Sequence, residues 1–328
     1  MSNNNRRMLA AFLSLFVLGA SAVHAQPTDS RPVIKILVGY APGGPFDPLS
    51  RIVAQGLSEA LKQNVIVEFK PGASGLIATD FVRIAAPDGL TLLLAPSPFV
   101  STPLMMRKPS YDPVTDFAAV GSVATFATVV VAGPNLSFNT MQELVAAAKA
   151  DPNLVSFGTP GVGGPAHLAG ELLQTVTKSK MTHVPYKGSS AVLPDLMAGR
   201  ITFTFQAPAG LKEMVAAQRV KALAVVGSTR RLPDLPIVPT MAEVGIPGFE
   251  DLGVWAGLVA PLKTPAAVIN RINEALQVAL KNPQTLERFR GIGAVPTGGT
   301  VKDFETFVAQ DGKRWAAIIK AANIPLND

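Results

Sequence analysis

The stretch Gly39-Tyr-Ala-Pro-Gly-Gly-Pro-Phe-Asp47 lies between a run typical of a buried strand and a run typical of a helix. A second stretch of the same kind, Gly158-Thr-Pro-Gly-Val-Gly-Gly-Pro-Ala-His167, follows in the middle of the chain. A strand that enters a helix through glycines leaves backbone N–H groups free at the positive end of the helix dipole, where an anion binds well. One such loop is only weak support for an anion-binding site. Two of them predict two lobes that close on a small carboxylate.

The residues around the first stretch alternate between strand and helix patterns. Val33–Val38 is apolar and β-branched, as in a strand buried on both faces. Asp47 and Pro48 then supply an N-cap and a first-turn proline, and apolar residues at helical spacing continue to about Asn64. A strand at 65–69, a helix at 75–86 and a strand at 90–94 follow. This βαβαβ order predicts a parallel sheet with helices on its faces.

The alternation continues through the rest of the chain. Strands are expected at 117–131 (one or two, broken near 125), 154–158, 181–186, 201–205, 220–226 and 254–259. Helices are expected at 140–150 (opened by a capping box), 166–177, 189–197 and 209–217, then from the cap Thr264-Pro265 to about 281, and from 300 to 321. With crossovers near 125 and 249, lobe 1 comprises 26–125 plus 249–328, and lobe 2 comprises 126–248. The ligand is expected in the cleft between them.

The N-terminus resembles a secretory signal peptide. Arg6 and Arg7 precede an apolar run that is too short to span a bilayer, and Val23-His24-Ala25 offers a small residue for cleavage after 25. A retained anchor is the alternative. Since the chain has no Cys, it has no disulfides and no lipid anchor, and it must depend on a large core. We expect export to the periplasm of a Gram-negative host.

The charge pattern argues against a nucleic-acid partner. The net charge of +6 comes from 29 Lys and Arg against 23 Asp and Glu, and the basic residues are scattered. A nucleic-acid binder would show a basic stripe with interleaved aromatic residues. The mild excess of positive charge is compatible with an anionic ligand.

Several further motifs carry a family resemblance across nearly all of the mature chain. They are Val38 to Asp47, Ala86-Pro-Asp-Gly-Leu-Thr-Leu-Leu-Leu94, Tyr111-Asp-Pro-Val-Thr-Asp-Phe117, His167-Leu-Ala-Gly-Glu-Leu172, His183-Val-Pro-Tyr-Lys-Gly188, Leu235 to Gly245 and Trp255-Ala-Gly-Leu258. With these motifs in this order, the chain resembles the Bug-type (TctC-like) extracytoplasmic solute receptors of tripartite tricarboxylate transport systems. The resemblance implies a type II periplasmic-binding-protein fold of the α/β class that closes like a clamshell on small organic acids. It also implies that both glycine loops hold one ligand carboxylate, and that membrane permease subunits are the partner.

The sequence departs from the family's pattern where selectivity is decided. Pro45 and Phe46 stand where the family usually has Ser or Thr, and Gly164-Pro-Ala166 replaces the Ser/Thr residues before His167. Gln206-Ala207 replaces a frequent Asp-Asn pair. We therefore expect a ligand with fewer polar substituents than citrate or aspartate, such as an aromatic or aliphatic mono- or dicarboxylate.

The candidate ligand-binding residues follow the strands. They are Gly43, Gly44, Phe46, Asp47, Ser97, Phe99, Thr159, Gly161, Gly163, Gly164, His167, Lys187 and Gln206. Each has a plainer interpretation: an ordinary βα turn for the glycines, an N-cap for Asp47, a structural residue for His167 and a solvated side chain for Lys187. The loop from Gly161 to Ala166 also mimics the G-x-G-x-x-A dinucleotide fingerprint, but no acidic residue ends the next strand to hold a ribose.

Two other classes of function stay open. An enzyme is disfavoured because the chain has no Cys and no G-x-S-x-G elbow, and because the two histidines of the mature chain, His167 and His183, have no nearby carboxylate pair with which to form a metal site. A ligand sensor for a membrane signalling protein would have the same fold and cleft, so only the partner separates it from a transport receptor. We expect no metal, no cofactor and a monomer.

Overall fold

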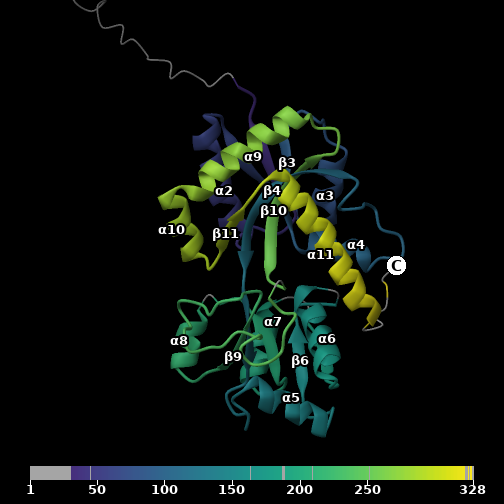
Figure 1. The fold of residues 1–328 in the computed structure, drawn as a ribbon, viewed down its shortest axis with the longest axis vertical. Coiled ribbons are helices and arrows are strands. Elements are labelled where there is room, and N and C mark those ends of the chain that lie inside the picture. Colours follow the sequence, from purple (N-terminus) through teal and green to yellow (C-terminus); the bar gives the residue numbers. More distant parts are fainter. Residues whose placement is uncertain are drawn as a thin grey trace, which may run out of the picture. The chain divides into compact units, whose positions relative to one another are not determined.

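The computed structural model describes residues 31–44, 46–162, 164–186, 189–208, 210–250, 252–321, 324 and 326. The expected signal peptide at 1–25 lies outside these residues. The helices and strands belong to one unit, Pro32–Asp328, and form two sheets with helices packed on them (Figure 1).

The first sheet has six strands in the order β11-β4-β10-β3-β1-β2. Their bounds are β1 Ile34–Val38, β2 Val65–Phe69, β3 Thr91–Pro96, β4 Phe117–Phe126, β10 Val254–Pro261 and β11 Val295–Gly298. β1 pairs in parallel with β2 and β3, as the βαβαβ pattern predicts. β10 is antiparallel to both β3 and β4, and β11 is antiparallel to β4. The parallel arrangement predicted for the βαβαβ segment is therefore confirmed, whereas β10, which enters from the other sheet, and β11 run opposite to the other four strands.

The second sheet has five strands in the order β7-β6-β8-β5-β9. Their bounds are β5 Thr128–Ala132, β6 Ser156–Thr159, β7 Thr182–Pro185, β8 Phe203–Gln206 and β9 Lys221–Val226. β6 is parallel to β7 and β8, and β5 runs antiparallel between β8 and β9. Each sheet thus combines parallel βα units with one antiparallel strand that arrives from the other sheet.

The helices cover the faces of the two sheets (Figure 1). Those on the first sheet are α2 Phe46–Leu61, α3 Leu76–Arg83 (after the 3-10 turn η1 Ala73–Gly75), α4 Pro98–Leu104, α9 Ala266–Lys281, α10 Pro283–Gly291 and α11 Val301–Ala321. Those of the second are α5 Met141–Ala150, α6 Pro165–Thr177, α7 Ser189–Met197 and α8 Leu211–Ala216. α11 also contacts α6, so it packs on elements of both sheets.

The core follows the two-residue period of the strands. Ile36 and Val38 of β1 belong to the cluster beneath α2 and α9, whereas Leu37 belongs to the cluster on the opposite face with Phe304 of α11. All four side chains are almost fully buried. Burial on both faces explains why this strand is uniformly apolar.

Two crossings join the sheets. The chain leaves the first sheet between Phe126 and Thr128, and returns through the segment 227–253. There the backbones of Gly227 and Gly253 lie in contact: a Cβ on Gly227 would stand 2.3 Å from the Gly253 Cα, and one on Gly253 would stand 3.0 Å from the Phe126 carbonyl oxygen. Only glycine permits this approach. The division into lobes at 125/126 and 248/249 stays a prediction.

Several sequence predictions need correction. α4, α10 and β11 were not expected, and α2 ends at Leu61 instead of about Asn64. Thr264 does not cap α9, because its hydroxyl donates to the Pro261 carbonyl oxygen at 2.7 Å and the N-cap position is taken by Pro265. The capping box predicted at Thr140 and Glu143 is confirmed, with both of its hydrogen bonds present.

Candidate functional site

A pocket of about 440 Å³ lies where the chain crosses between the sheets. Its walls come from both: Tyr40, Phe46, Ser74, Pro98, Thr102, Phe126 and Val254 from the first, and Thr128, Pro160, Gly161, Gly164, Pro165, Ala166, His167, Ala169, Phe205 and Ala207 from the second, with Ala127 and Leu252 from the crossings. Residues far apart in the sequence thus meet at the ends of strands, the usual ligand position in α/β sheets.

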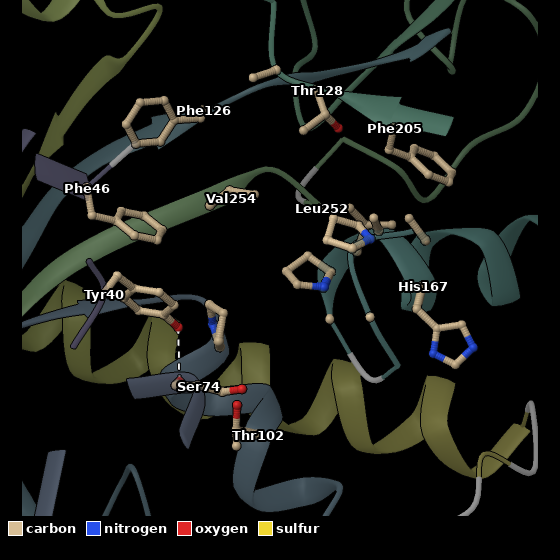
Figure 2. Close-up of a pocket in the computed structure, with 18 of the residues that line it drawn as sticks. Tyr40, Phe46, Ser74, Thr102, Phe126, Thr128, His167, Phe205, Leu252 and Val254 are labelled. Carbon is tan, nitrogen blue, oxygen red and sulfur yellow. Dashed lines mark hydrogen bonds between the residues drawn. The ribbon is translucent and has the colours of Figure 1, made fainter. Parts of the chain in front are cut away.

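Aromatic side chains dominate one end of the pocket. Figure 2 shows Tyr40, Phe46 and Phe126 gathered on one side, with Phe205 and His167 on the other. Tyr40 follows β1, and Phe46 is the first residue of α2; their ring centroids lie 5.0 Å apart at an angle of 53°. Tilted ring pairs of this kind are favourable beyond the area that they bury. This end therefore offers a stiff, apolar surface to a ligand.

The Tyr40 hydroxyl is already engaged. It donates to the Ser74 carbonyl oxygen at 3.1 Å, and burial raises the pKa of Tyr40, so the phenol stays neutral. Ser74 has a left-handed backbone (φ 56°), as does Ala73 (φ 46°), which is uncommon for residues other than glycine. The Tyr40 hydrogen bond fixes this turn, which brings Ser74 to the pocket wall.

The N-terminus of α6 forms the opposite end. The N-cap residue is Gly164, Pro165 is the first helical residue, and no described side chain caps the first-turn amides. Cβ atoms built on Gly161 and Gly164 would meet nothing closer than 4.0 Å, so this loop is open to a guest. The 13-residue helix directs the positive end of its dipole to the same place. The arrangement suits an anion.

Thr159, at the end of β6, holds the loop before α6. Its hydroxyl donates to the Gly161 carbonyl oxygen at 2.9 Å and lies 2.7 Å from Nε2 of His183. Because a hydroxyl has one proton, the geometry assigns the proton of the second bond to His183 Nε2. Burial and, after it, the charge of His167 lower the pKa of His183 to about 4, so its ring is neutral at pH 7.

His167 and His183 stack face to face. Their ring centroids are 3.9 Å apart at 20°, and Phe157 stacks on His183 at 4.9 Å. His167 Nε2 lies 3.5 Å from the Glu171 carboxylate, one turn along α6. His167 lines the pocket. His183 is not among the described lining residues, and it supports the pocket through its ring contact with His167.

The first glycine loop differs from the second. The Gly43 N–H donates to the Asp47 carboxylate at 2.8 Å, and Arg51 Nε lies 2.5 Å from the same group. Asp47 is therefore not the N-cap of α2, which begins at Phe46; its carboxylate bonds backwards to the loop. The Gly43 hydrogen bond is the main cause that lowers the pKa of Asp47. This loop therefore presents the Tyr40 and Phe46 rings to the pocket, while its Gly43 amide is engaged by Asp47.

The structure brings four of the predicted site residues to the pocket wall: Phe46, Gly161, Gly164 and His167. Gly43, Gly44, Asp47, Ser97, Phe99, Thr159 and Gln206 are not among the described lining residues. Gly163 and Lys187 lie outside the described residues. Ligand contact by any of the thirteen stays a prediction.

Two of the predicted residues have other surroundings. Phe99 packs against Tyr111 and Phe117 and accepts a hydrogen bond from the Tyr111 hydroxyl at its carbonyl oxygen. Ser97 is buried, and its hydroxyl has no hydrogen-bond partner among the described residues.

Other lining residues were not predicted. Tyr40 lies within the quoted first loop, so a signal for it was present. Phe126, Thr128, Leu252 and Val254 reach the pocket through the crossing of the sheets, for which no local sequence pattern exists, whereas Ser74 and Thr102 reach it from η1 and α4.

The chain is similar to known proteins along most of its length. Residues 49–324 match the model of the tripartite tricarboxylate transporter family receptor, TctC. The chain belongs to this family. BugT of Bordetella pertussis is 32% identical over 98% of this chain and 99% of its own length.

Solved structures show the same fold. The periplasmic binding protein BugD has a TM-score of 0.74 and 31% identity, with 90% of this chain and 99% of BugD covered. R. palustris Rpa4515, solved with adipate, has a TM-score of 0.78 and 31% identity, with 91% and 99% covered. These neighbours confirm the expected two-lobed periplasmic-binding-protein fold. Among the described helices of this TctC-family chain, none combines the length and apolar composition that a membrane span needs.

Proposed function

We propose that this chain is a periplasmic receptor that captures a small organic carboxylate between its two sheets and presents it to a membrane transporter. Its membership of a transporter-receptor family supports the role, and the adipate in Rpa4515 supports the ligand class. The observation that carries the proposal is a pocket walled by both sheets, with an uncapped helix N-terminus at one end. A guest there touches both halves of the fold.

The ligand's carboxylate is held at the α6 end. The amides of Gly161 and Ala166 are the donors, and the helix dipole adds to them. Hydrogen bonds to a charged group contribute about 1.5–3 kcal/mol each, so these two supply about 3–6 kcal/mol before the costs of ordering and closure, and burial of the ligand's apolar body adds to them. In the first loop the Gly43 N–H already donates to the Asp47 carboxylate. That loop therefore contributes the Phe46 and Tyr40 side chains to ligand binding.

Binding is coupled to closure of two lobes, 26–125 with 249–328 and 126–248. The crossings at Phe126–Thr128 and at Gly227 and Gly253 are the hinge segments, because they are the backbone links between the sheets. The ligand drives closure only if it binds the closed form more tightly than the open one. The closed form is what the membrane partner recognises.

The setting of this activity follows from the N-terminus. The signal peptide is removed after Ala25, and the mature receptor acts in the periplasm as a monomer without a cofactor, without nucleic acid and without enzymatic turnover. N-terminal sequencing of the protein from a periplasmic fraction tests the cleavage. A mature chain that begins with Met1 and sediments with membranes would contradict it.

Calorimetry with a panel of organic acids tests the receptor role, with Ala166→Pro as the diagnostic variant. Proline is tolerated in the first turn of a helix but removes the N–H, so affinity for the best acid should fall by about 10- to 100-fold. Lys302→Pro is the matched control, since it places proline at the second residue of the exposed start of α11. Equal affinity in the wild type and Ala166→Pro would refute the site.

A further inference from the structure

The described lining of the pocket contains no Lys, Arg, Asp or Glu. Its ionisable side chains are Tyr40 and His167. Tyr40 is neutral and donates its hydroxyl proton in a hydrogen bond to the Ser74 carbonyl oxygen, and His167 has the Glu171 carboxylate 3.5 Å away. The nearby cation Arg51 is paired with Asp47 at 2.5 Å. Favourable potential for an anion is therefore concentrated at the N-terminus of α6.

At the other end of the pocket, no described lining residue carries a positive charge that could balance a carboxylate. Phe46 and Phe126 are 7% and 9% exposed, and Val254 and Leu252 continue the apolar surface beside them. A carboxylate placed there would lose its water without gaining a cation from any described residue, which is far more costly than burying a methyl or a ring edge. The hydroxyls of Ser74 and Thr102 are neutral polar groups on the same side of the pocket.

We infer that the ligand of this receptor is a monocarboxylate with a ring or a branched apolar body, and that dicarboxylates are disfavoured. The inference rests on the proposed function and specifies the ligand class of the same site. The carboxylate lies against α6, and the apolar body lies between Phe46, Tyr40 and Phe126. An aromatic body suits these rings, because tilted and offset ring contacts add to the area buried. The selectivity would differ from that of Rpa4515, whose structure holds the dicarboxylate adipate.

The test compares acids that differ by one carboxylate. Calorimetry on the mature protein would use benzoate against terephthalate, and hexanoate against adipate. In each pair the monoacid should bind at least about tenfold more tightly, equivalent to about 1.4 kcal/mol. A diacid that binds as tightly as its monoacid, or more tightly, would overturn this inference and leave the proposed function standing. No binding by any acid of either pair would refute the carboxylate receptor itself.

A gain-of-function variant makes the test independent of the wild-type ligand. Thr102→Lys places a cation on the neutral wall of the pocket, at a half-buried helix position whose side chain makes no hydrogen bond to a described residue. Adipate and terephthalate should gain at least about tenfold in affinity relative to Thr102→Met, which has a neutral side chain of similar length. Affinities of the two variants for adipate that agree within error would contradict the inference.

Discussion

Replacing Gly170 by alanine should loosen the helix that binds the ligand. Gly170 lies in the middle of α6, where a Cβ would stand 2.2, 2.6 and 2.7 Å from three carbons of the Phe157 ring. Carbon atoms in contact lie about 3.5–4.0 Å apart, so the ring or the helix must shift by about 1.5 Å. Phe157 is fully buried and stacks on His183, so the shift is transmitted to the residues behind the pocket.

Two opposing effects set the magnitude. Alanine in a helix interior is favoured over glycine by about 1 kcal/mol, whereas overpacking a buried contact costs about 1–3 kcal/mol or more. Because the overlap involves a ring held between α6 and the sheet, we expect overpacking to dominate. The free energy of unfolding should fall by about 1–2 kcal/mol, and affinity for the acid should fall with it.

Urea unfolding followed by circular dichroism measures the first effect, and calorimetry with the best acid measures the second. Gly291→Ala is the matched control, because Gly291 ends α10 and a Cβ there meets nothing within 4 Å. The control should equal the wild type or exceed it in stability. A Gly170→Ala protein as stable as the control would refute the packing argument.

Two further predictions concern buried polar groups. The pKa of His183, lowered to about 4, makes its contribution to stability complete above pH 6.5 and progressively lost as the pH falls toward 4. His183→Gln should reduce the loss of unfolding free energy at acid pH by about 1–2 kcal/mol, a modest value because the ring is partly exposed. Unfolding of both proteins at about pH 7 and about pH 4.5 measures this loss, and identical losses would contradict the prediction. Asp311 is 1% exposed and accepts hydrogen bonds from Trp255 Nε1 at 2.8 Å, Trp315 Nε1 at 3.0 Å and Arg314. Asp311→Ala should destabilise the fold by about 2–4 kcal/mol, because it leaves the buried indole N–H groups of Trp255 and Trp315 without their acceptor. The two tryptophans report unfolding by fluorescence, and a loss below about 1 kcal/mol would count against the network.

The regular βα elements could be predicted from the sequence because their signals are local. β1 and α2 follow from hydrophobic period, and the α5 cap follows from Thr140 and Glu143. α10 had a signal that was overlooked: Asn282 caps the amides of Gln284 and Thr285 just before Pro283. β11 is a four-residue edge strand with an exposed Val295, too short to show a period.

The pocket could be predicted only in part. The α6 loop was found because glycine and proline at a helix start are visible in sequence. The hydrogen bond from the Gly43 N–H to Asp47 could not be predicted, because it depends on the direction of the Asp47 side chain. The N-cap pattern at Asp47-Pro48 does not specify that direction. Phe126 and Leu252 reach the pocket because the chain crosses between the sheets beside them, a tertiary feature.

A crystal structure of the receptor with the tightest monocarboxylate of the panel is the most direct test. It should show the carboxylate within hydrogen-bond distance of the Gly161 and Ala166 amides, with the apolar body against Tyr40 and Phe46. A carboxylate bound beside the aromatic wall, or a ligand outside this pocket, would contradict the account.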